Sequence, residues 1–145
     1  MVLAQEFNEF ESGKKVINMT GYYTKIEEDT VNNTNFRKVL YTGRYSQLVV
    51  MSLKPGEEIG TEVHDNIDQF FRVEEGSAKF IVDKEETQVG EDEAFIVPAG
   101  SEHNVINAGD KDLKLYTIYS PAEHPDGTIH KTKSEADEYE KEHHH

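Results

Sequence analysis

The stretch TEVHDNIDQFF contains an acid, an imidazole and an amide, which are Glu62, His64 and Gln69. Side chains of these types can bind metal ions, and the acid and the imidazole can also transfer protons. Glu62 and His64 are separated by one residue, so on a strand both would project from the same face. Gln69 follows a turn-like insert and opens the next apolar run. Carboxylate and imidazole groups are common ligands of divalent metal ions. The stretch therefore has two interpretations: ligands that converge on one ion, or polar residues on a solvated turn.

The apolar pattern around Gln69 places its amide on the inside of the fold. If Gln69 faces inward, alternation also directs Phe71 and Val73 inward, which agrees with their apolar character. A second imidazole, His103, begins another apolar run directly after the turn Pro98–Gly100, which would present it at the start of a strand. The side chains that could do chemistry are thus two imidazoles, a carboxylate and an amide.

Short strands must position these side chains. Apolar or alternating runs rich in Val, Ile, Phe and Tyr predict strands at Arg37–Thr42, Gln47–Leu53, Gln69–Val73, Ala78–Val82, Ala94–Val97, His103–Asn107 and Leu113–Tyr119. Their length and even spacing favour a sandwich or barrel over βαβ units. Met19–Glu27 is a further candidate strand, and Asp29–Asn35 is expected to be a loop. Thr132 could cap a short acidic helix that ends at Glu142, and without an apolar stripe that helix should be solvated.

Composition narrows the classes of function. The chain has 145 residues, enough for one domain with a sizeable core, and a formal net charge of −14. A chain this acidic, without clustered Lys and Arg, is predicted to bind neither nucleic acid nor an anionic membrane. It contains no cysteine, which excludes disulfides and thiolate metal sites. With neither a secretory signal nor an apolar run near the roughly 20 residues of a membrane span, we expect a soluble, cytoplasmic protein.

Two motifs in this order resemble those of the cupin superfamily, and of its small single-domain members in particular. They read Gly56-x5-Glu62-x-His64-x4-Gln69-x6-Gly76 and, after about twenty residues, Pro98-x-Gly100-x2-His103-x3-Asn107, with Asp92 where the second motif usually has Gly. The resemblance covers roughly residues 46–119. It implies an all-β fold, the double-stranded β-helix or cupin jelly-roll barrel, here with a short C-terminal helical tail. It also implies a metal or ligand inside the barrel mouth, and a homodimer.

The resemblance implies a metal-ligand set that differs from the usual three His and one Glu. The matching positions are Glu62, His64, Gln69 and His103. Two imidazoles and one carboxylate suit a divalent Fe, Mn, Zn, Ni or Co ion, and Glu62 could instead act as a base. A neutral amide at position 69 is a weaker donor than carboxylate. In the alternative interpretation the barrel has kept its shape and lost its metal, with Glu62 and His103 hydrogen-bonded to each other.

Other side chains are candidates for the pocket wall. Phe71, Phe95, Tyr119 and His124 are the predicted substrate-pocket residues. His124 and His130 lie in a Pro-containing segment, where exposed loop histidines are the default. The sharper hypothesis is that this segment folds over the barrel mouth and offers Tyr119 or His124 to a substrate.

The predicted organisation is an N-terminal extension (1–35) with a possible strand for the barrel or dimer, a cupin barrel (36–120), a C-terminal segment with an acidic helix (121–142) and a probable tag remnant (143–145). The predicted function is a metal-dependent enzyme acting on a small organic substrate, with dioxygenase, isomerase or lyase type chemistry. The alternative is a non-catalytic module that binds a small ligand. A turnover screen would separate the two, and metal analysis would separate the enzyme from a barrel that has lost its metal.

Overall fold

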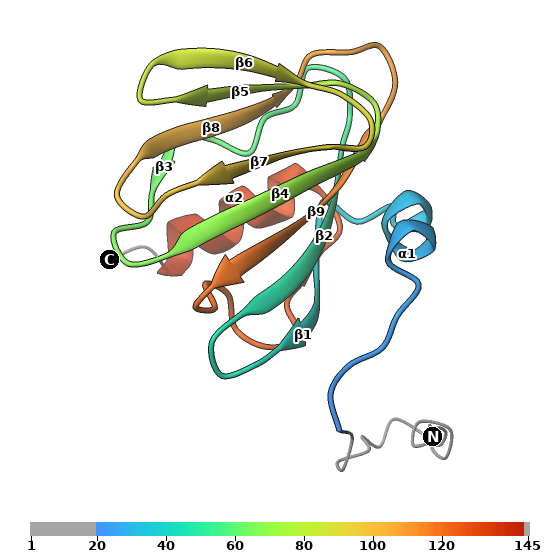
Figure 1. Cartoon of the computed structure of the whole chain (residues 1–145), viewed down its shortest axis with the longest axis vertical. Coiled ribbons are helices and arrows are strands. Elements are labelled where there is room, and N and C mark those ends of the chain that lie inside the picture. Colours follow the sequence, from blue (N-terminus) through green and yellow to red (C-terminus); the bar gives the residue numbers. More distant parts are fainter. Residues whose placement is uncertain (1–19, 144–145) are drawn as a thin grey trace.

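Two antiparallel β-sheets face each other and form a barrel (Figure 1). The computed structural model describes residues 20–143. The strand order is β10-β1-β2-β9-β4-β7 in the larger sheet and β3-β8-β5-β6 in the smaller one. The strands are β1 (Arg37–Thr42), β2 (Gln47–Leu53), β3 (Glu62–Val63), β4 (Asp68–Glu75), β5 (Ala78–Val82), β6 (Glu85–Val89), β7 (Glu93–Val97), β8 (Glu102–Asn107), β9 (Leu113–Ser120) and β10 (Ile129–His130). The predicted all-β jelly-roll barrel, a double-stranded β-helix, is confirmed.

Every predicted strand of the barrel is present, with ends that differ by no more than two residues. Sequence analysis missed β6, whose residues Glu85–Gln88 are exposed and polar. This strand lies at the edge of the smaller sheet and pairs only with β5, so its side chains are solvated and carry no apolar pattern. The two-residue strands β3 and β10 were also missed, because two residues are too few to show a period.

Alternate side chains of the larger sheet point into the barrel. Gln69, Phe71 and Val73 on β4 are all buried, as the alternation predicts. Strand register aligns Gln47, Tyr119 and Gln69 in one row across β2, β9 and β4. All three side chains are almost completely buried. This row forms the wall of the barrel end at which β3 and the start of β8 also lie.

Turns at the other end of the barrel are held by Asn107, the last residue of β8. Its Nδ2 donates to the carbonyl oxygens of Leu53 and Lys111, each at 2.9 Å, and its Oδ1 accepts from the Gly109 amide at 2.9 Å. The side chain is 2% exposed. Asn107 therefore secures the turns at this end of the barrel.

Two helices lie outside the barrel, α1 (Ile26–Asn32) and α2 (Lys133–His143). The predicted strand at Met19–Glu27 is wrong for its described residues, and the predicted loop at Asp29–Asn35 begins with the last turn of α1. Local sequence predicts this seven-residue helix poorly because tertiary contacts hold it: the buried Lys114 Nζ on β9 donates to the carbonyl oxygen of Asn33, 2.7 Å away. Residues 1–19 of the predicted N-terminal extension, and two of the three residues of the predicted tag remnant, lie outside the described residues.

The C-terminal acidic helix is present as α2, and Thr132 caps it by accepting from the Glu135 amide at 3.0 Å. The expectation that this helix is solvated on all sides is wrong. Ala136 is buried, and the rings of Tyr139 and His130 lie 5.2 Å apart, so one side of α2 packs beside β10. Within residues 20–143, neither helix is long and apolar enough to cross a membrane.

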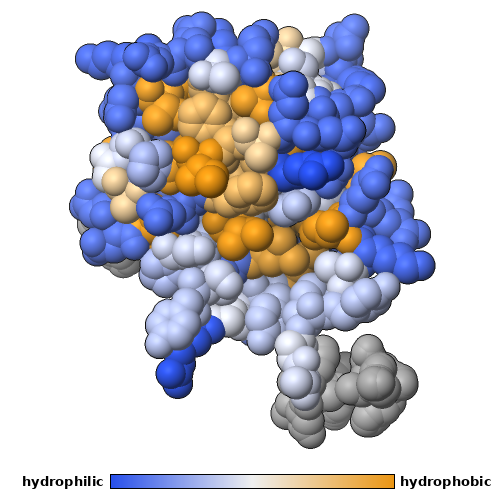
Figure 2. All heavy atoms as spheres, in the orientation of Figure 1, coloured by the Kyte–Doolittle hydropathy of each residue, from blue (hydrophilic) through white to orange (hydrophobic). Residues whose placement is uncertain are grey.

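Apolar side chains gather over β7, β4 and β9 on the outer face of the larger sheet (Figure 2). Cross-strand pairing aligns Ile96, Phe70, Ile118 and Leu48 in one row on this face. Ile96 is 62% exposed. The barrel thus has an apolar exterior stripe in addition to its core.

Candidate metal centre

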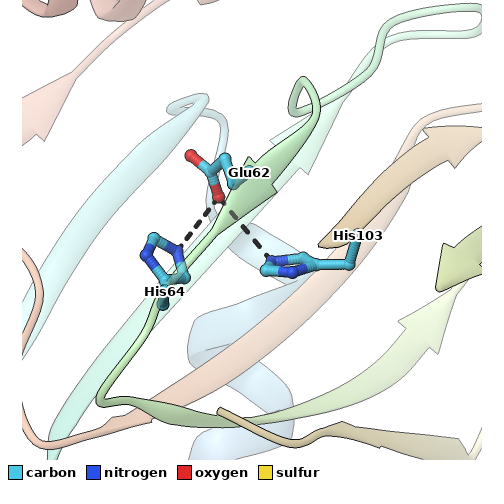
Figure 3. Close-up of side chains that lie close together, drawn as sticks. All are labelled: Glu62, His64 and His103. Atoms are coloured by element: carbon cyan, nitrogen blue, oxygen red, sulfur yellow. Dashed lines mark hydrogen bonds and ion pairs between the residues drawn. The ribbon is translucent and has the colours of Figure 1, made fainter. Parts of the chain in front are cut away.

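Glu62, His64 and His103 meet at one end of the barrel (Figure 3). Glu62 begins β3 and lies directly opposite His103 of β8 in the antiparallel pairing. His64 follows β3, and its ring centroid lies 5.4 Å from that of His103. One ligand atom from each of the three side chains lies within 4.8 Å of the others. The pairing of β3 with β8 therefore brings together groups that are about forty residues apart in the chain.

His103 presents an unpaired nitrogen to this cluster. Its Nδ1 lies 3.1 Å from the carbonyl oxygen of Ser101, and because a carbonyl only accepts, Nδ1 carries the hydrogen. Nε2 is buried and has no hydrogen-bond partner. In neutral His103 that nitrogen carries a lone pair, and an imidazole fixed through its other nitrogen is typical of metal ligands.

Glu62 forms a hydrogen bond with His64 and only a longer ion-pair contact with His103 (Figure 3). His64 Nε2 lies 3.2 Å from Glu62 Oε1, whereas His103 Nε2 lies 3.8 Å from the same oxygen, beyond hydrogen-bond distance. Burial alone would raise the pKa of Glu62, but the hydrogen bond from His64 and nearby positive charges outweigh it and lower the pKa. The hydrogen bond to Glu62 in turn raises the pKa of His64, against the effect of burial. The carboxylate is therefore ionised at neutral pH.

Gln69 points toward the same end of the barrel with one half of its amide unused. Its Nε2 donates to Thr117 Oγ1 at 3.0 Å, while its Oε1 is buried without a partner. The side chain is 2% exposed. An oxygen in this state can accept from a bound water or ligand, or coordinate a hard cation.

The segment after β9 folds across this end of the barrel. Gln47 Nε2 donates to the carbonyl oxygen of His124 at 2.7 Å, and its Oε1 accepts from the amides of Glu123 and His124. His124 Nε2 lies 3.2 Å from the hydroxyl of Tyr119, and their rings meet edge-on. Burial and, next, the charge of Arg37 lower the pKa of His124 to about 3, so the imidazole is neutral and can accept from the phenol.

The default expectation that His124 and His130 are exposed loop histidines is wrong. His130 is buried opposite Arg37, and His124 is half-buried against Tyr119. The structure also places Tyr119 at the cluster, since its ring lies 6.1 Å from that of His64. The segment thus lies over this end of the barrel, as the sharper hypothesis expected, and its role toward a substrate stays a prediction. The default expectation failed because Gln47, which holds the segment in place, is 77 residues from His124 along the chain.

Phe71 and Phe95 differ in their distance from the cluster. The Phe71 ring lies edge-on to His103 at 6.5 Å and packs beneath it. Phe95 stacks on Phe80 at 5.0 Å and has no aromatic contact with the site residues in the described chain. The structure therefore brings Phe71 to the site and leaves Phe95 in the packing behind it.

Two charged residues that sequence analysis did not select also face the site. Glu123 Oε1 lies 3.7 Å from His64 Nδ1, and burial raises the pKa of Glu123. Arg37 is 4% exposed, and its positive charge acts on the titration of Glu62, His64 and Glu123. The signal for Arg37 was weak, because Lys38 next to it makes both faces of β1 equally polar in sequence.

The donor set fits a divalent metal ion. Two imidazoles and a carboxylate converge, one imidazole nitrogen is buried without a partner, and an unpaired amide oxygen lies on β4 of the facing sheet. Such N and O donors suit Fe, Mn, Zn, Ni or Co, and the carboxylate would offset part of the ion's charge. The side chains of Glu62 and Glu123 are 30% and 32% exposed, so this end of the barrel is open to solvent.

Known proteins resemble the chain over its barrel and beyond. A sequence model described as Cupin domain matches residues 49–119. The chain is 45% identical over 121 residues to the uncharacterized protein YrkC of Bacillus subtilis, and the match covers 79% of this chain and 65% of YrkC. It is 43% identical over 112 residues to the uncharacterized protein L612 of Acanthamoeba polyphaga mimivirus, covering 74% and 70%. The crystal structure of BH2720 from Bacillus halodurans matches with a TM-score of 0.79 at 42% identity, covering 81% of this chain and 93% of that one.

Proposed function

The chain belongs to the cupin family, and from that premise we propose that it is a metal-dependent enzyme acting on a small organic substrate. Glu62, His64 and His103 would hold the ion, with Gln69 as a fourth ligand or as a partner of its bound water. The observation that carries the proposal is the buried, unpaired Nε2 of His103, which faces a carboxylate and a second imidazole.

Several residues of the chain would prepare the substrate for reaction. A divalent ion supplies a Lewis acid when bound. Glu123 lies at the opening, where its carboxylate can accept or return a proton, and Tyr119 and His124 form a hydrogen-bonded wall beside it. The reaction type, whether dioxygenase, isomerase or lyase, is not fixed by these groups, because the fold serves many chemistries.

Metal content of tag-free protein tests the proposal. We expect about one equivalent of a divalent transition metal per chain, and loss of at least about 100-fold in affinity when His64 or His103 becomes Ala, since each removes one ligand. Phe70→Ala, on the outer face of the larger sheet, is the control and should keep its metal. Absence of metal after growth in supplemented medium, with folded protein, would falsify the proposal.

A turnover screen separates the enzyme from the alternative, a non-catalytic ligand-binding module. Metal-loaded protein that consumes oxygen or converts a small organic compound, and loses this activity with Glu123→Gln, would support the enzyme. Metal-loaded protein that binds a compound without converting it would support the binding module. Both outcomes leave the metal site itself in place.

The predicted homodimer remains a proposal, and the apolar row on the outer face supports it. Ile96, Phe70 and Ile118 lie side by side on that face and would be covered in a dimer. Light scattering after size exclusion should give twice the chain mass for the wild type. Ile96→Glu should give the monomer mass, and unchanged dimer would show that another face forms the contact.

A further inference from the structure

We propose that the barrel mouth recognises a small organic carboxylate and that the guanidinium of Arg37 is its counter-ion. This inference rests on the proposed function, because it names the class of ligand that the metal centre would serve. It concerns a residue that lies outside the candidate metal-ligand set, on the opposite sheet from Glu62 and His103.

The side chain of Arg37 lies inside the barrel. Strand register places Arg37 directly opposite Met51 on one side and His130 on the other, and Met51 is a fully buried core residue. Arg37 itself is 4% exposed. A charged side chain this deeply buried is uncommon unless it has a charged partner.

No such partner is present among residues 20–143. Every carboxylate oxygen of this part of the chain lies more than 4.0 Å from the guanidinium, and Nε is buried without any hydrogen-bond partner. The contact that Nη1 makes is with His130 Nδ1, 3.4 Å away. Burial and then the charge of Arg37 lower the pKa of His130, so that imidazole is neutral and cannot balance the positive charge.

The carboxylates of Glu62 and Glu123 already have a partner in the imidazole of His64. Glu62 Oε1 lies 3.2 Å from His64 Nε2, and Glu123 Oε1 lies 3.7 Å from His64 Nδ1. Both carboxylates also lie more than 4.0 Å from the guanidinium of Arg37. Arg37 contacts His130, at the end of the segment that crosses the mouth, so its guanidinium lies against that segment with no carboxylate of residues 20–143 beside it.

A carboxylate fits the unused donors best. A guanidinium can donate two parallel hydrogen bonds, from Nε and one Nη, to the two oxygens of a planar carboxylate. Phosphate fits less well, because one guanidinium would oppose a dianion while Glu62 and Glu123 repel it. A ligand with its carboxylate on Arg37 would direct the rest of its skeleton toward Glu62 and His64. We expect a monocarboxylate with few atoms beyond the acid group.

Matched acid and amide pairs test this with the wild-type protein. Acetate, propionate and benzoate would be titrated by calorimetry against acetamide, propionamide and benzamide, and against inorganic phosphate, using both metal-loaded and metal-free protein. The acids should bind at least about tenfold more tightly than their amides, and more tightly than phosphate, in the metal-loaded form. Equal binding of acids and amides, or tighter binding of phosphate, would overturn the proposal.

Variants then assign the effect to one residue. Arg37→Gln should remove the preference for acids over amides while it keeps the metal content, and Arg37→Lys should keep part of it. Arg72→Gln is the control, because Arg72 lies on the outer face beside Asp92 and should behave as wild type. Without ligand, Arg37→Gln should melt at or above the wild-type temperature, since it removes an unpaired buried charge. A preference for acids that survives Arg37→Gln would overturn the proposal.

The two proposals fail in different ways. Metal-loaded protein without any acid preference contradicts the carboxylate proposal and leaves the metal centre intact. Protein that never binds metal, yet still distinguishes acids from amides through Arg37, contradicts the metal-dependent function alone. If Arg37→Gln does not fold, the comparison of acids with amides on the wild type still decides the matter.

Discussion

The two ends of β8 carry buried polar side chains that are used in opposite ways. At the end of the strand, Asn107 makes three hydrogen bonds and has no unused polar atom. At its start, His103 leaves Nε2 unpaired, and Gln69 and Arg37, on β4 and β1 of the facing sheet, leave one atom unpaired each. The other unpaired buried atoms of residues 20–143 belong to Arg72 and Glu74, which form an ion pair at 3.6 Å.

The two ends of the barrel thus have different roles: the Asn107 end stabilises the fold, and the His103 end is available for binding. Buried polar groups that serve the fold are satisfied within the fold, because each unpaired group costs about 1–3 kcal/mol. Unpaired atoms that gather in one place mark where something else is expected to bind. Changes at the Asn107 end should therefore alter stability, and changes at the His103 end should alter binding. Four substitutions test this separation.

Asn107→Ala should have the largest effect on stability. It would leave the carbonyl oxygens of Leu53 and Lys111 and the Gly109 amide without their partner, which should lower the free energy of unfolding by about 4 kcal/mol. Urea denaturation measures this. Asn66→Ala, in the exposed turn before β4, is the control and should change stability by less than about 0.5 kcal/mol. A loss of under about 1 kcal/mol for Asn107→Ala would contradict the structural role.

Gly76→Ala should follow, with a loss of about 3 kcal/mol. Gly76 has a φ of +94°, and an added Cβ would lie 2.9 Å from the carbonyl oxygen of Asp112, which is backbone and cannot move aside. Gly56 is the matched control, because it has a φ of +85° and open space around it. Gly56→Ala should cost only the strain of the left-handed conformation, about 1 kcal/mol. Similar losses for the two variants would show that the close approach to Asp112 is unimportant.

Gln69→Glu changes a residue at the His103 end of the barrel and should alter metal binding. A carboxylate at this position would add a charged oxygen at the same end of the barrel as His103 and should raise metal affinity about tenfold, or about 1.4 kcal/mol. The same change should lower the stability of metal-free protein, because an unpaired carboxylate would be buried. Isothermal calorimetry and thermal melts with and without metal measure the two effects. Unchanged metal affinity would place Gln69 outside the coordination sphere.

Asp92→Gly should have the smallest effect and leave metal binding unchanged. Asp92 has a φ of +67°, a conformation that glycine adopts without strain, and its side chain accepts from Arg72 Nη2 at 3.1 Å on the surface. Relief of strain stabilises the folded protein, whereas loss of this exposed contact and the greater freedom of the unfolded chain destabilise it. The first effect should be larger, so the free energy of unfolding should rise by about 0.5 kcal/mol. Chemical denaturation would detect it, and a net loss would show that Arg72 holds the turn.

The spacing of two motifs was enough to predict the barrel and the convergence of Glu62 with two imidazoles. Spacing works there because short turns fix which strand ends meet. Arg37 could not be predicted in the same way, since its orientation depends on the pairing of β1 with Met51 and His130, which are distant in sequence. The default expectation for His124, an exposed loop histidine, failed for the same reason, because the position of His124 depends on Gln47. Contacts of long range, and not local pattern, set the polar wall of the mouth.

The amide of Gln47 has a consequence for how ligands enter. All four of its hydrogen bonds are made, three of them to the segment that carries Glu123 and His124, and the side chain is 1% exposed. The rim of the opening is thereby joined to a central strand and moves with the barrel as one body. We expect small molecules to enter and leave through an opening of constant width. The largest molecule that can enter is then fixed by the barrel itself. The segment beyond Pro125 can differ in length without changing the width of the opening.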